Sequence, residues 1–266
     1  AFQLIKNVKM SVVIHDVIAH PYFKMSKREM MVEFLRRNYM RKTIRKSHSI
    51  IVLSDNSVNE FCKRYPKAVG KIQKLILGAH VPVVNLKELK ELKGEKNYFL
   101  FFGRIDKYKG IDRLVEAFNN SAISNKLVIA GKGTLLPDTL RLINNNKNII
   151  FINRFIEDEE MVYLYRNCKC VVLPYIEASQ SGVLPIAYHF CKPVIISNLP
   201  GLLENVIENK TGLIFKDTLG LEKAIVSMVS LDYSDNIKEY YNERFSWKKN
   251  VRILLNTLLE VGNREV

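Results

Sequence analysis

Long apolar runs are missing from this sequence of 266 residues. No run approaches the ~20 residues of a membrane-spanning helix, and the chain does not open with the charged, apolar and small-residue segments of a signal peptide. Cysteine is scarce, and its four copies form neither a C-x-x-C pair nor a Cys/His cluster with zinc spacing. We therefore expect a cytoplasmic protein without a metal site, whose thiols are reduced and buried: Cys62, Cys168, Cys170 and Cys191.

Two catalytic signatures are also incomplete. A serine hydrolase elbow needs G-x-S-x-G, but the stretch ASQSG has Ala178 where the first glycine should stand. A dinucleotide fingerprint needs G-x-G-x-x-G, and the run GKGTLL ends in Leu136 instead of a third glycine. These two departures disfavour a serine hydrolase and an NAD-dependent oxidoreductase.

Negative charge is in short supply. The chain has 41 Lys and Arg against 27 Asp and Glu, a formal net charge of +14. Such a balance predicts attraction to anionic partners, such as nucleic acids, phosphorylated metabolites or acidic lipid surfaces, and charge alone does not choose among them. No recognised nucleic-acid module or interleaved aromatic pattern accompanies the charge, so we expect no nucleic-acid partner.

From residue 97 onward, short β-rich runs alternate with segments of helical periodicity. This alternation is typical of a parallel sheet covered by helices on both faces. The strands are apolar throughout, which supports the parallel arrangement because strands buried on both faces have no polar side to expose. We expect a doubly wound α/β domain over 97–245, with strands at 98–103, 126–131, 148–153, 168–174, 192–197 and 211–215.

Residues 1–80 are organised differently. Two strand-like segments, 10–17 and 48–55, flank a basic helix that spans roughly Ser26 to Ser47. The chain begins without Met and enters a strand-like segment almost at once. We therefore expect part of a second Rossmann-like α/β domain, without its opening strands.

Two further segments complete the expected organisation. Residues 81–96 are rich in Lys and Glu and show no clear core, which predicts a linker between the two domains. Ser246 is a reasonable N-cap for a terminal helix over 246–266.

The loops that follow the expected strands are the places to search for a site, because ligands of open α/β sheets bind at the carboxyl ends of the strands. After the first strand of the larger domain, Gly103 allows a tight turn and Arg104 leaves the strand end at once. Lys109 and Gly110 then lead into a helix. Two cations beside helix N-terminal amides can hold a diphosphate, and the alternative is a solvated loop with incidental charge.

The loop after the fourth of these strands, EASQSGVLP, has the small residues and free amides of an anion-binding loop. Pro185 fits only the first turn of a helix, so the helix should begin near Ser181 or Gly182 and point its amides toward the ligand edge. Glu177 would then lie beside a positive pocket as an acceptor for hydroxyl groups. In the third loop, Arg154 follows the strand, and the acids at 157–160 are best explained as caps that complement the helix dipole.

These features, in this order, resemble the nucleotide-sugar glycosyltransferases of the GT-B fold, in the retaining group called group 1 or family 4. The resemblance covers essentially all of residues 97–262. Each motif is weak alone and their combination is specific: FFGRIDKYKGIDRLVEAF, LVIAGKG, FINRFIEDEEMVYLYRNCKCVVLPYIEASQSG, KPVIISNLPGLLENVIENKTGLIF and RFSW. HDVIAHPYF and IRKSHSIIVLSDNSVNEF look like the last third of that family's acceptor-side domain.

The resemblance implies roles for individual residues. Arg104 and Lys109, with Gly103, would hold the donor diphosphate, and Glu177 would contact the donor sugar. Backbone amides at Ser181, Gly182 and Val183 would meet the phosphates. The base and sugar would be bordered by Arg154, Phe155, Ile156, Ser179 and Gln180. Many members bind the ribose through a second glutamate eight residues after the first; here that position is Pro185, so the ribose must be held in another way.

The same resemblance indicates chemistry without a metal. No D-x-D pair of carboxylates occurs, so the leaving diphosphate would be stabilised by the cations and helix amides. Retention without an obvious nucleophile fits front-face attack, in which the leaving phosphate helps to deprotonate the acceptor. From the smaller domain, His15, Asp16 and His20 follow a strand end. His15 is a candidate for contacting sugar or acceptor, and a structural histidine is the alternative.

The basic segment 24–46 carries cations together with regularly spaced apolar residues. Its simple interpretation is a core-facing helix with a cationic outer face. Its sharper interpretation is docking to an anionic membrane, where lipid-linked acceptors occur.

We expect a metal-independent, retaining glycosyltransferase of polysaccharide biosynthesis that is located in the cytoplasm, with a peripheral position on the inner face of the membrane as the sharper expectation. It would need no cofactor and would transfer sugar from a UDP-sugar or GDP-sugar to a glycan or lipid-linked saccharide. The alternative is a non-catalytic nucleotide-binding fragment or pseudoenzyme of the same fold.

Overall fold

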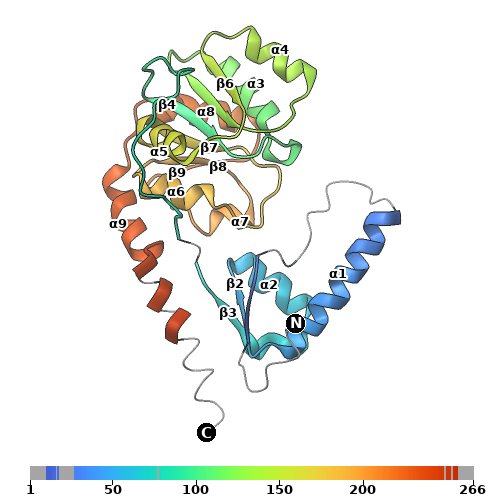
Figure 1. The fold of residues 1–266 in the computed structure, drawn as a ribbon. Coiled ribbons are helices and arrows are strands. Elements are labelled where there is room, and N and C mark those ends of the chain that lie inside the picture. Colours follow the sequence, from blue (N-terminus) through green and yellow to red (C-terminus); the bar gives the residue numbers. More distant parts are fainter. Residues whose placement is uncertain are drawn as a thin grey trace. The chain divides into compact units, whose positions relative to one another are not determined.

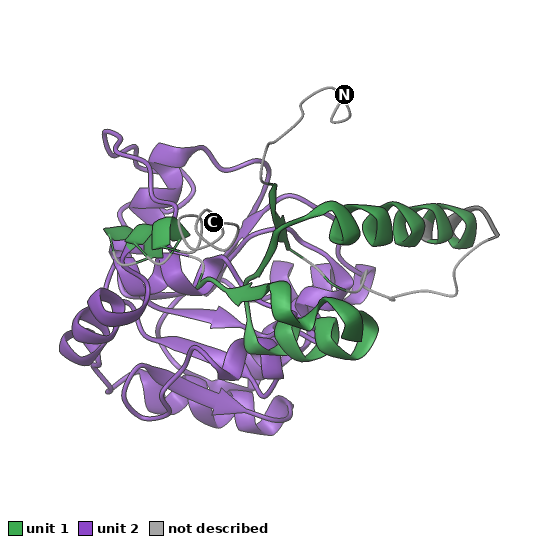
Figure 2. Cartoon of the chain, turned by 90° about the horizontal axis from the view of Figure 1, so that it is seen from below, with its two compact units in different colours: residues 1–77, 247–266 green, residues 78–246 purple. Residues whose placement is uncertain are grey.

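The structure is a computed structural model that describes residues 10–15, 17, 27–76, 78–248, 250–252 and 254–256. Two compact units make up the chain: unit 1 combines residues 1–77 with 247–266, and unit 2 consists of residues 78–246 (Figure 2). Each unit contains one parallel sheet, which confirms the expected α/β class.

Unit 2 is built on a six-stranded sheet in which every neighbouring pair is parallel (Figure 1). Five strands of four to six residues carry almost only apolar side chains, and β6 ends in Asn153. All six expected strands are confirmed, as β4 (Tyr98–Phe102), β5 (Leu127–Gly131), β6 (Ile149–Asn153), β7 (Cys168–Leu173), β8 (Val194–Ser197) and β9 (Gly212–Phe215).

The strand order is β6-β5-β4-β7-β8-β9. The chain therefore starts in the middle of the sheet, builds outward to β6, and returns to the other side of β4 with β7. At β4 and β7 the connections leave in opposite directions, and this topological switch point is where open α/β sheets bind their ligands.

Helices cover both faces of this sheet (Figure 1). On one face α3 (Ile111–Ser121) packs against α4 (Pro137–Asn144) and α8 (Thr218–Met228). On the other face lie α5 (Asp158–Asn167), α6 (Val183–His189) and α9 (Ser234–Arg244), with α6 against α9. The short α7 (Pro200–Leu203) follows β8. Apolar residues at helical spacing explain α3, which buries Ile111, Leu114, Val115 and Phe118.

The N-terminus of α5 has a reciprocal cap. The Glu157 side chain accepts from the backbone of Glu160, and the Glu160 side chain accepts from the backbone N–H of Glu157. This capping box satisfies two amides that the helix leaves free, and it confirms the expected capping role of the acids at 157–160.

Unit 2 also contains the segment 81–96. Leu89 and Leu92 are buried there, whereas the sequence suggested no core residues in this stretch. The two leucines are separated from each other and flanked by lysines and glutamates, so the stretch contains no apolar run that would mark a core element. The boundary between the two domains stays a prediction.

Unit 1 has a parallel sheet of β1 (Ser11–Ile14), β2 (Ser49–Val52) and β3 (Ile72–Lys74), in that order. The expected basic helix is confirmed as α1 (Lys27–Lys46). The helix α2 (Asp55–Arg64), capped by Ser54, and the 3-10 helix η1 (Pro66–Lys71) complete the unit. A small core holds the elements together: Ile14, Val17, Ile44, Ile50, Val52, Phe61 and Ala68.

The cysteines follow the expectation in part. All four thiols are free, and Cys168 and Cys170 are buried in β7. Cys62 and Cys191 are only half-buried, so the expectation of burial was wrong for these two. Cys62 lies on α2, and Cys191 lies in the turn after α6.

Candidate functional site

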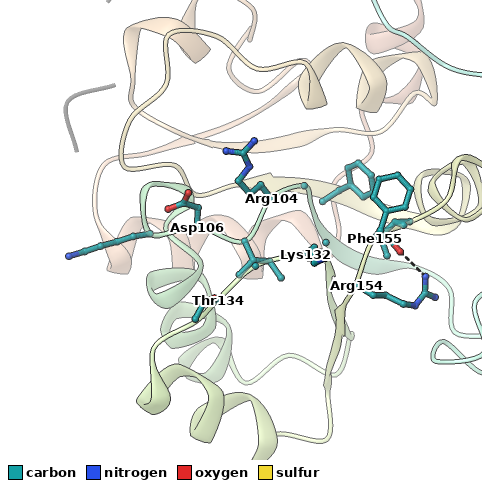
Figure 3. A pocket seen from close by; sticks show the side chains of 13 residues that line it. Arg104, Asp106, Lys132, Thr134, Arg154 and Phe155 are labelled. Atoms are coloured by element: carbon teal, nitrogen blue, oxygen red, sulfur yellow. Dashed lines mark hydrogen bonds between the residues drawn. The ribbon is translucent and has the colours of Figure 1, made fainter. Parts of the chain in front are cut away.

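A cavity of about 810 Å³ lies in unit 2 at the carboxyl ends of β4, β5 and β6 (Figure 3). Its wall comes from the three loops that follow these strands, and the residues that line it are Phe102, Gly103, Arg104, Ile105, Asp106, Lys107, Gly131, Lys132, Gly133, Thr134, Arg154, Phe155 and Ile156. The cavity therefore occupies the sheet edge that the strand order marks as the ligand edge.

The loops after β4 and β5 run side by side as an extension of the sheet. The backbone N–H of Gly103 donates to Ala130 at 3.0 Å, and that of Ile105 donates to Lys132 at 3.0 Å. The two loops approach so closely that a Cβ on Gly131 would lie 1.8 Å from the Gly103 carbonyl oxygen. The glycines of the run GKG thus serve close backbone packing, which explains why a third glycine is not needed.

Asn153, at the end of β6, ties the third loop to the second. Its Oδ1 accepts from the Gly133 N–H at 3.1 Å, and its Nδ2 donates to the Gly133 carbonyl at 3.1 Å. A side-chain amide that satisfies both backbone groups of one residue fixes that residue firmly. The three loops therefore form one connected rim around the cavity.

Cations dominate this rim. Arg104, Lys107 and Lys132 are exposed and line the cavity, against the single half-buried carboxylate of Asp106. Arg104 was expected at this edge as a diphosphate ligand; it lines the cavity, and its role stays a prediction. Lys107 and Lys132 were not singled out from the sequence, because a lone lysine in a polar loop carries no signal of its own.

Arg154 also lines the cavity, but its guanidinium is engaged elsewhere. It makes a double hydrogen bond to the buried Glu160 carboxylate at 2.6 and 3.0 Å, and it donates to Glu91 at 3.1 Å. The hydrogen bond to Glu160 raises the pKa of Arg154, and the same bond holds the pKa of Glu160 below its usual range. This cation is thus part of the scaffold. The neighbouring Phe155 ring is 76% exposed beside the cavity (Figure 3).

Lys109 does not line the cavity. Its ammonium lies 3.6 Å from the centre of the Tyr175 ring and 5.0 Å from that of Tyr108. Burial, and then the charge of Arg104, lower the pKa of Lys109 to about 8, against the opposing effect of Asp106. The two cations that were expected to bind the diphosphate therefore lie in different surroundings. Arg104 lines the cavity, and the Lys109 ammonium packs over the Tyr175 ring.

The loop after β7, residues 174–182, lies on the other side of the switch point. Its backbone joins the first loop, since the Ile176 N–H donates to the Tyr108 carbonyl at 2.8 Å. The helix α6 begins at Val183 with Gly182 as N-cap, and Pro185 is buried in its first turn, which confirms the expected helix start. Several expected site residues belong to this region and do not line the cavity: Glu177, Ser179, Gln180, Ser181, Gly182 and Val183.

The predictions about histidines and about a metal concern other parts of the chain. His15 is exposed and follows β1 in unit 1. Asp16 and His20 lie outside the described residues. In the part of the chain that the structure describes, no group of three or more His, Cys, Asp or Glu side chains could hold a metal ion.

Known proteins resemble both the sequence and the fold. A family model described as "Glycosyl transferases group 1" matches residues 85–253. Two uncharacterised glycosyltransferases of Methanocaldococcus jannaschii are similar: MJ1178 is 28% identical over 171 residues, which are 61% of this chain and 48% of the relative. MJ1069 is 25% identical over 179 residues, which are 62% of this chain and 46% of the relative. The chain spans about half the length of these relatives.

Solved structures share the fold at lower identity. Sucrose-phosphate synthase of Thermosynechococcus elongatus aligns with a TM-score of 0.69 and 19% identity, over 94% of this chain and 67% of that protein. HepE of Anabaena, in complex with UDP and glucose, aligns with a TM-score of 0.71 and 16% identity, over 95% of this chain and 72% of that protein.

Proposed function

Because the chain belongs to the glycosyl transferases group 1 family, we propose that it transfers a sugar from a nucleoside-diphosphate sugar to a glycan or lipid-linked saccharide. The observation that carries the proposal is a cavity at the carboxyl edge of the unit 2 sheet, rimmed by the cations Arg104, Lys107 and Lys132. An anion bound there meets the positive charge of three exposed side chains on one rim.

The donor diphosphate is assigned to the rim of the first loop. Arg104 supplies a guanidinium that matches the geometry of phosphate oxygens. Lys107 and Lys132 add charge from the same rim. Lys109 reaches the diphosphate by leaving the Tyr175 ring, and its charge is favoured once an anion is present. Gly103 leaves its neighbourhood open, since a Cβ there would meet nothing within 4 Å.

The nucleoside is assigned to the third loop. Phe155 presents an exposed aromatic face for stacking on a base. Arg154 and Ile156 border the same space, Arg154 with the part of its side chain that Glu160 leaves free. Pro185 is buried in α6 and has no group for the ribose hydroxyls, so the ribose is assigned to polar groups of the cavity rim.

The sugar is assigned to the loop after β7. Glu177 is half-buried between the switch point and α6. Its carboxylate is the acceptor that hydroxyl groups of a hexose require. Ser179 and Gln180 are assigned to the same polar wall, and the amides of Ser181, Gly182 and Val183 are assigned to the phosphates.

The reaction is proposed to proceed with retention and without a metal. Positive charge from Arg104 and Lys109 stabilises the leaving diphosphate, as a divalent ion does in other transferases. A phosphate oxygen then takes the proton of the acceptor hydroxyl as the new glycosidic bond forms on the same face. His15, in the other unit, is assigned to the sugar or acceptor.

A membrane surface is the proposed location of the acceptor, on the cytoplasmic side. The support comes from α1, whose Met40 and Ile44 pack in unit 1 while its N-terminal half exposes apolar side chains. Met31, Phe34 and Leu35 are among them, each about 60% exposed. The cations Arg37, Arg41 and Lys42 are exposed on the following turns. Among the described residues, no helix is long and apolar enough to cross a membrane.

The proposal is tested by binding and by turnover. Thermal stability is measured with UDP, GDP, ADP and their sugars, each with Mg²⁺ and with EDTA, on wild type and on the double variant Arg104→Ala/Lys109→Ala. We expect one nucleoside diphosphate to stabilise the wild type with or without Mg²⁺, and the variant to respond far less. An equal response of the variant, or no response of wild type to any nucleotide, would refute the donor site.

A measurement of turnover distinguishes a transferase from a non-catalytic nucleotide-binding protein. A transferase releases nucleoside diphosphate from its donor when acceptor is present, whereas the alternative, a non-catalytic nucleotide-binding protein, binds the donor and releases nothing. Release is measured with UDP-glucose and GDP-mannose over a panel of glycans and lipid-linked saccharides. Binding of a donor without release across the panel would favour the non-catalytic role.

A further inference from the structure

Arg113, on α3, links three elements around the switch point. Its Nε donates to the Pro174 carbonyl at 2.8 Å, and its Nη2 donates to the Tyr175 carbonyl and to the Ser197 hydroxyl, the latter at 2.6 Å. Ser197 ends β8, and its hydroxyl donates in turn to the Leu173 carbonyl at 3.2 Å. One guanidinium thus holds the first two residues of the loop after β7.

The Arg113 guanidinium lies near an aromatic ring and has no carboxylate partner among the described residues. It lies 5.1 Å from the Phe215 ring, and burial lowers the pKa of Arg113. No carboxylate pairs with it among the residues that the structure describes. Arg113 is half-buried, and a cation that loses part of its hydration without a counter-charge costs free energy that an apolar side chain of similar size would avoid. What Arg113 contributes is geometry, because its planar fork fits two successive carbonyl oxygens.

The same loop is confined from its other end. A Cβ on Gly201, in α7, would lie 2.4 Å from the carbonyl oxygens of both Ala178 and Ser179. Gly110 has φ +66, and a Cβ there would lie 1.8 Å from the Pro174 carbonyl oxygen. The backbone is therefore fixed immediately before Glu177, by Arg113 and Gly110, and immediately after it, by Gly201.

We propose that Arg113 is a positioning residue for the sugar end of the donor. By fixing the carbonyls of Pro174 and Tyr175, it sets the position of Glu177 opposite the cationic rim of the first loop. It touches neither sugar nor phosphate, and it acts through Glu177. The inference rests on the proposed function, since it needs a nucleotide sugar bound between these two loops.

The test compares a nucleoside diphosphate with its sugar. Titration calorimetry gives the Kd of UDP and UDP-glucose, and of GDP and GDP-mannose, and the pair that wild type binds more tightly is followed. The ratio of the two Kd values isolates what the sugar adds. The ratio is the Kd of the nucleoside diphosphate divided by the Kd of its sugar. We expect Glu177→Gln to change this ratio about tenfold. We expect Arg113→Lys to change the ratio in the same direction and by a similar factor. The Kd of the diphosphate alone should change by less than about twofold.

The double variant decides the role. If Arg113 acts through Glu177, Arg113→Lys changes nothing further in the Glu177→Gln background. Arg244→Lys is the matched control, because the Arg244 guanidinium also holds a backbone carbonyl, that of Glu204, at 2.9 Å. We expect it to lower the melting temperature as much as Arg113→Lys does and to leave the ratio unchanged.

Each failure has a separate meaning. Additive effects in the double variant, or an equal loss of diphosphate and sugar affinity in Arg113→Lys, would overturn the positioning role while the proposed function stands. A wild type that binds no nucleotide would overturn both. If Arg113→Lys does not fold, Gly201→Ala displaces the same loop from the other side, and an unchanged ratio in that variant would contradict the inference.

Discussion

Gly133 and Ile105 approach each other so closely that a Cβ on the glycine would lie 1.9 Å from the Ile105 carbonyl oxygen. Gly133→Ala therefore forces apart the first two loops of the cavity rim. We expect a loss of at least ~2 kcal/mol in the free energy of unfolding, measured by urea denaturation. Gly182→Ala is the control, because a Cβ there meets nothing within 4 Å. Equal stability of the two variants would contradict the close approach.

The ammonium of Lys109 gives donor binding a pH signature. Its pKa is about 8 in the free protein, below the ordinary 10.5. A lysine whose pKa falls on folding destabilises the native state while it is charged, and this penalty is lifted as the pH rises from about 8 to 10.5. A bound diphosphate favours the charged form and raises the pKa, so binding should take up a proton just above pH 8.

This uptake is measured by calorimetry near pH 8.5, in two buffers of different ionisation enthalpy. We expect a fraction of a proton to be taken up with the nucleoside diphosphate that wild type binds. Lys109→Met should abolish the uptake and be more stable than wild type at pH 7. Proton uptake that persists in Lys109→Met would show that another group titrates.

Arg154 and Glu160 should matter for folding more than for binding. Arg154→Met leaves the Glu160 carboxylate, which is only 4% exposed, without its cation. We expect a loss of ~2 kcal/mol at pH 7. Because the folded-state pKa of Glu160 is lowered, its contribution is present above its ordinary value of 4.5 and is lost as the pH falls through the lower folded value.

Urea denaturation of wild type and Arg154→Met at pH 7 and near pH 3 therefore gives a difference that shrinks in acid. Arg154→Met/Glu160→Gln, which removes both charges and keeps an acceptor for the Glu157 N–H, should recover most of the lost stability. A variant Arg154→Met that keeps its stability but loses nucleotide affinity would instead place this cation on the donor.

The exposed half of α1 should bind anionic lipid. Co-sedimentation is measured with phosphatidylcholine vesicles, with and without phosphatidylserine. We expect binding only with the anionic lipid, weakened by salt because the cations contribute. Phe34→Ser/Leu35→Ser removes the apolar part and Arg37→Glu/Arg41→Glu reverses the charge, and either should reduce binding at least tenfold. Val226→Ser/Val229→Ser, which also removes exposed apolar side chains, is the control. Unchanged binding in both α1 variants would remove the membrane proposal.

The sheet of unit 2 could be predicted because each of its strands is a compact apolar run with Gly or polar residues at its borders. The family match and the solved neighbours confirm the resemblance to GT-B glycosyltransferases. β3 escaped prediction because its sequence, Ile-Gln-Lys, is short and mostly polar, and the strand is only half-buried. α2 was missed because only Ser57 and Phe61 are buried among its ten residues.

Site residues could be predicted only where they directly follow a strand that the sequence pattern reveals. Arg104 and the residues 154–156 follow strands directly, so the strand pattern places them on the cavity. The contact between the Lys109 ammonium and the Tyr175 ring joins two loops that are distant in sequence. No local sequence pattern encodes such a contact. Arg113 looked like an ordinary helical residue for the same reason. Its partners, in the loop after β7 and at the end of β8, become visible only when the sheet is assembled.

The boundary between the neighbouring strands β4 and β7 divides unit 2 into two parts, one with β4, β5 and β6 and the other with β7, β8 and β9. All thirteen cavity-lining residues come from the side that ends with β6, whereas the loop with Glu177 belongs to the other side. In the proposed function, the nucleoside and the sugar of a donor are thus assigned to separate, continuous stretches of the chain. Exchanging the segment between β7 and α6 for that of a relative should therefore change the sugar preference and leave the residues that line the cavity unchanged, provided that the two carbonyls held by Arg113 keep their positions.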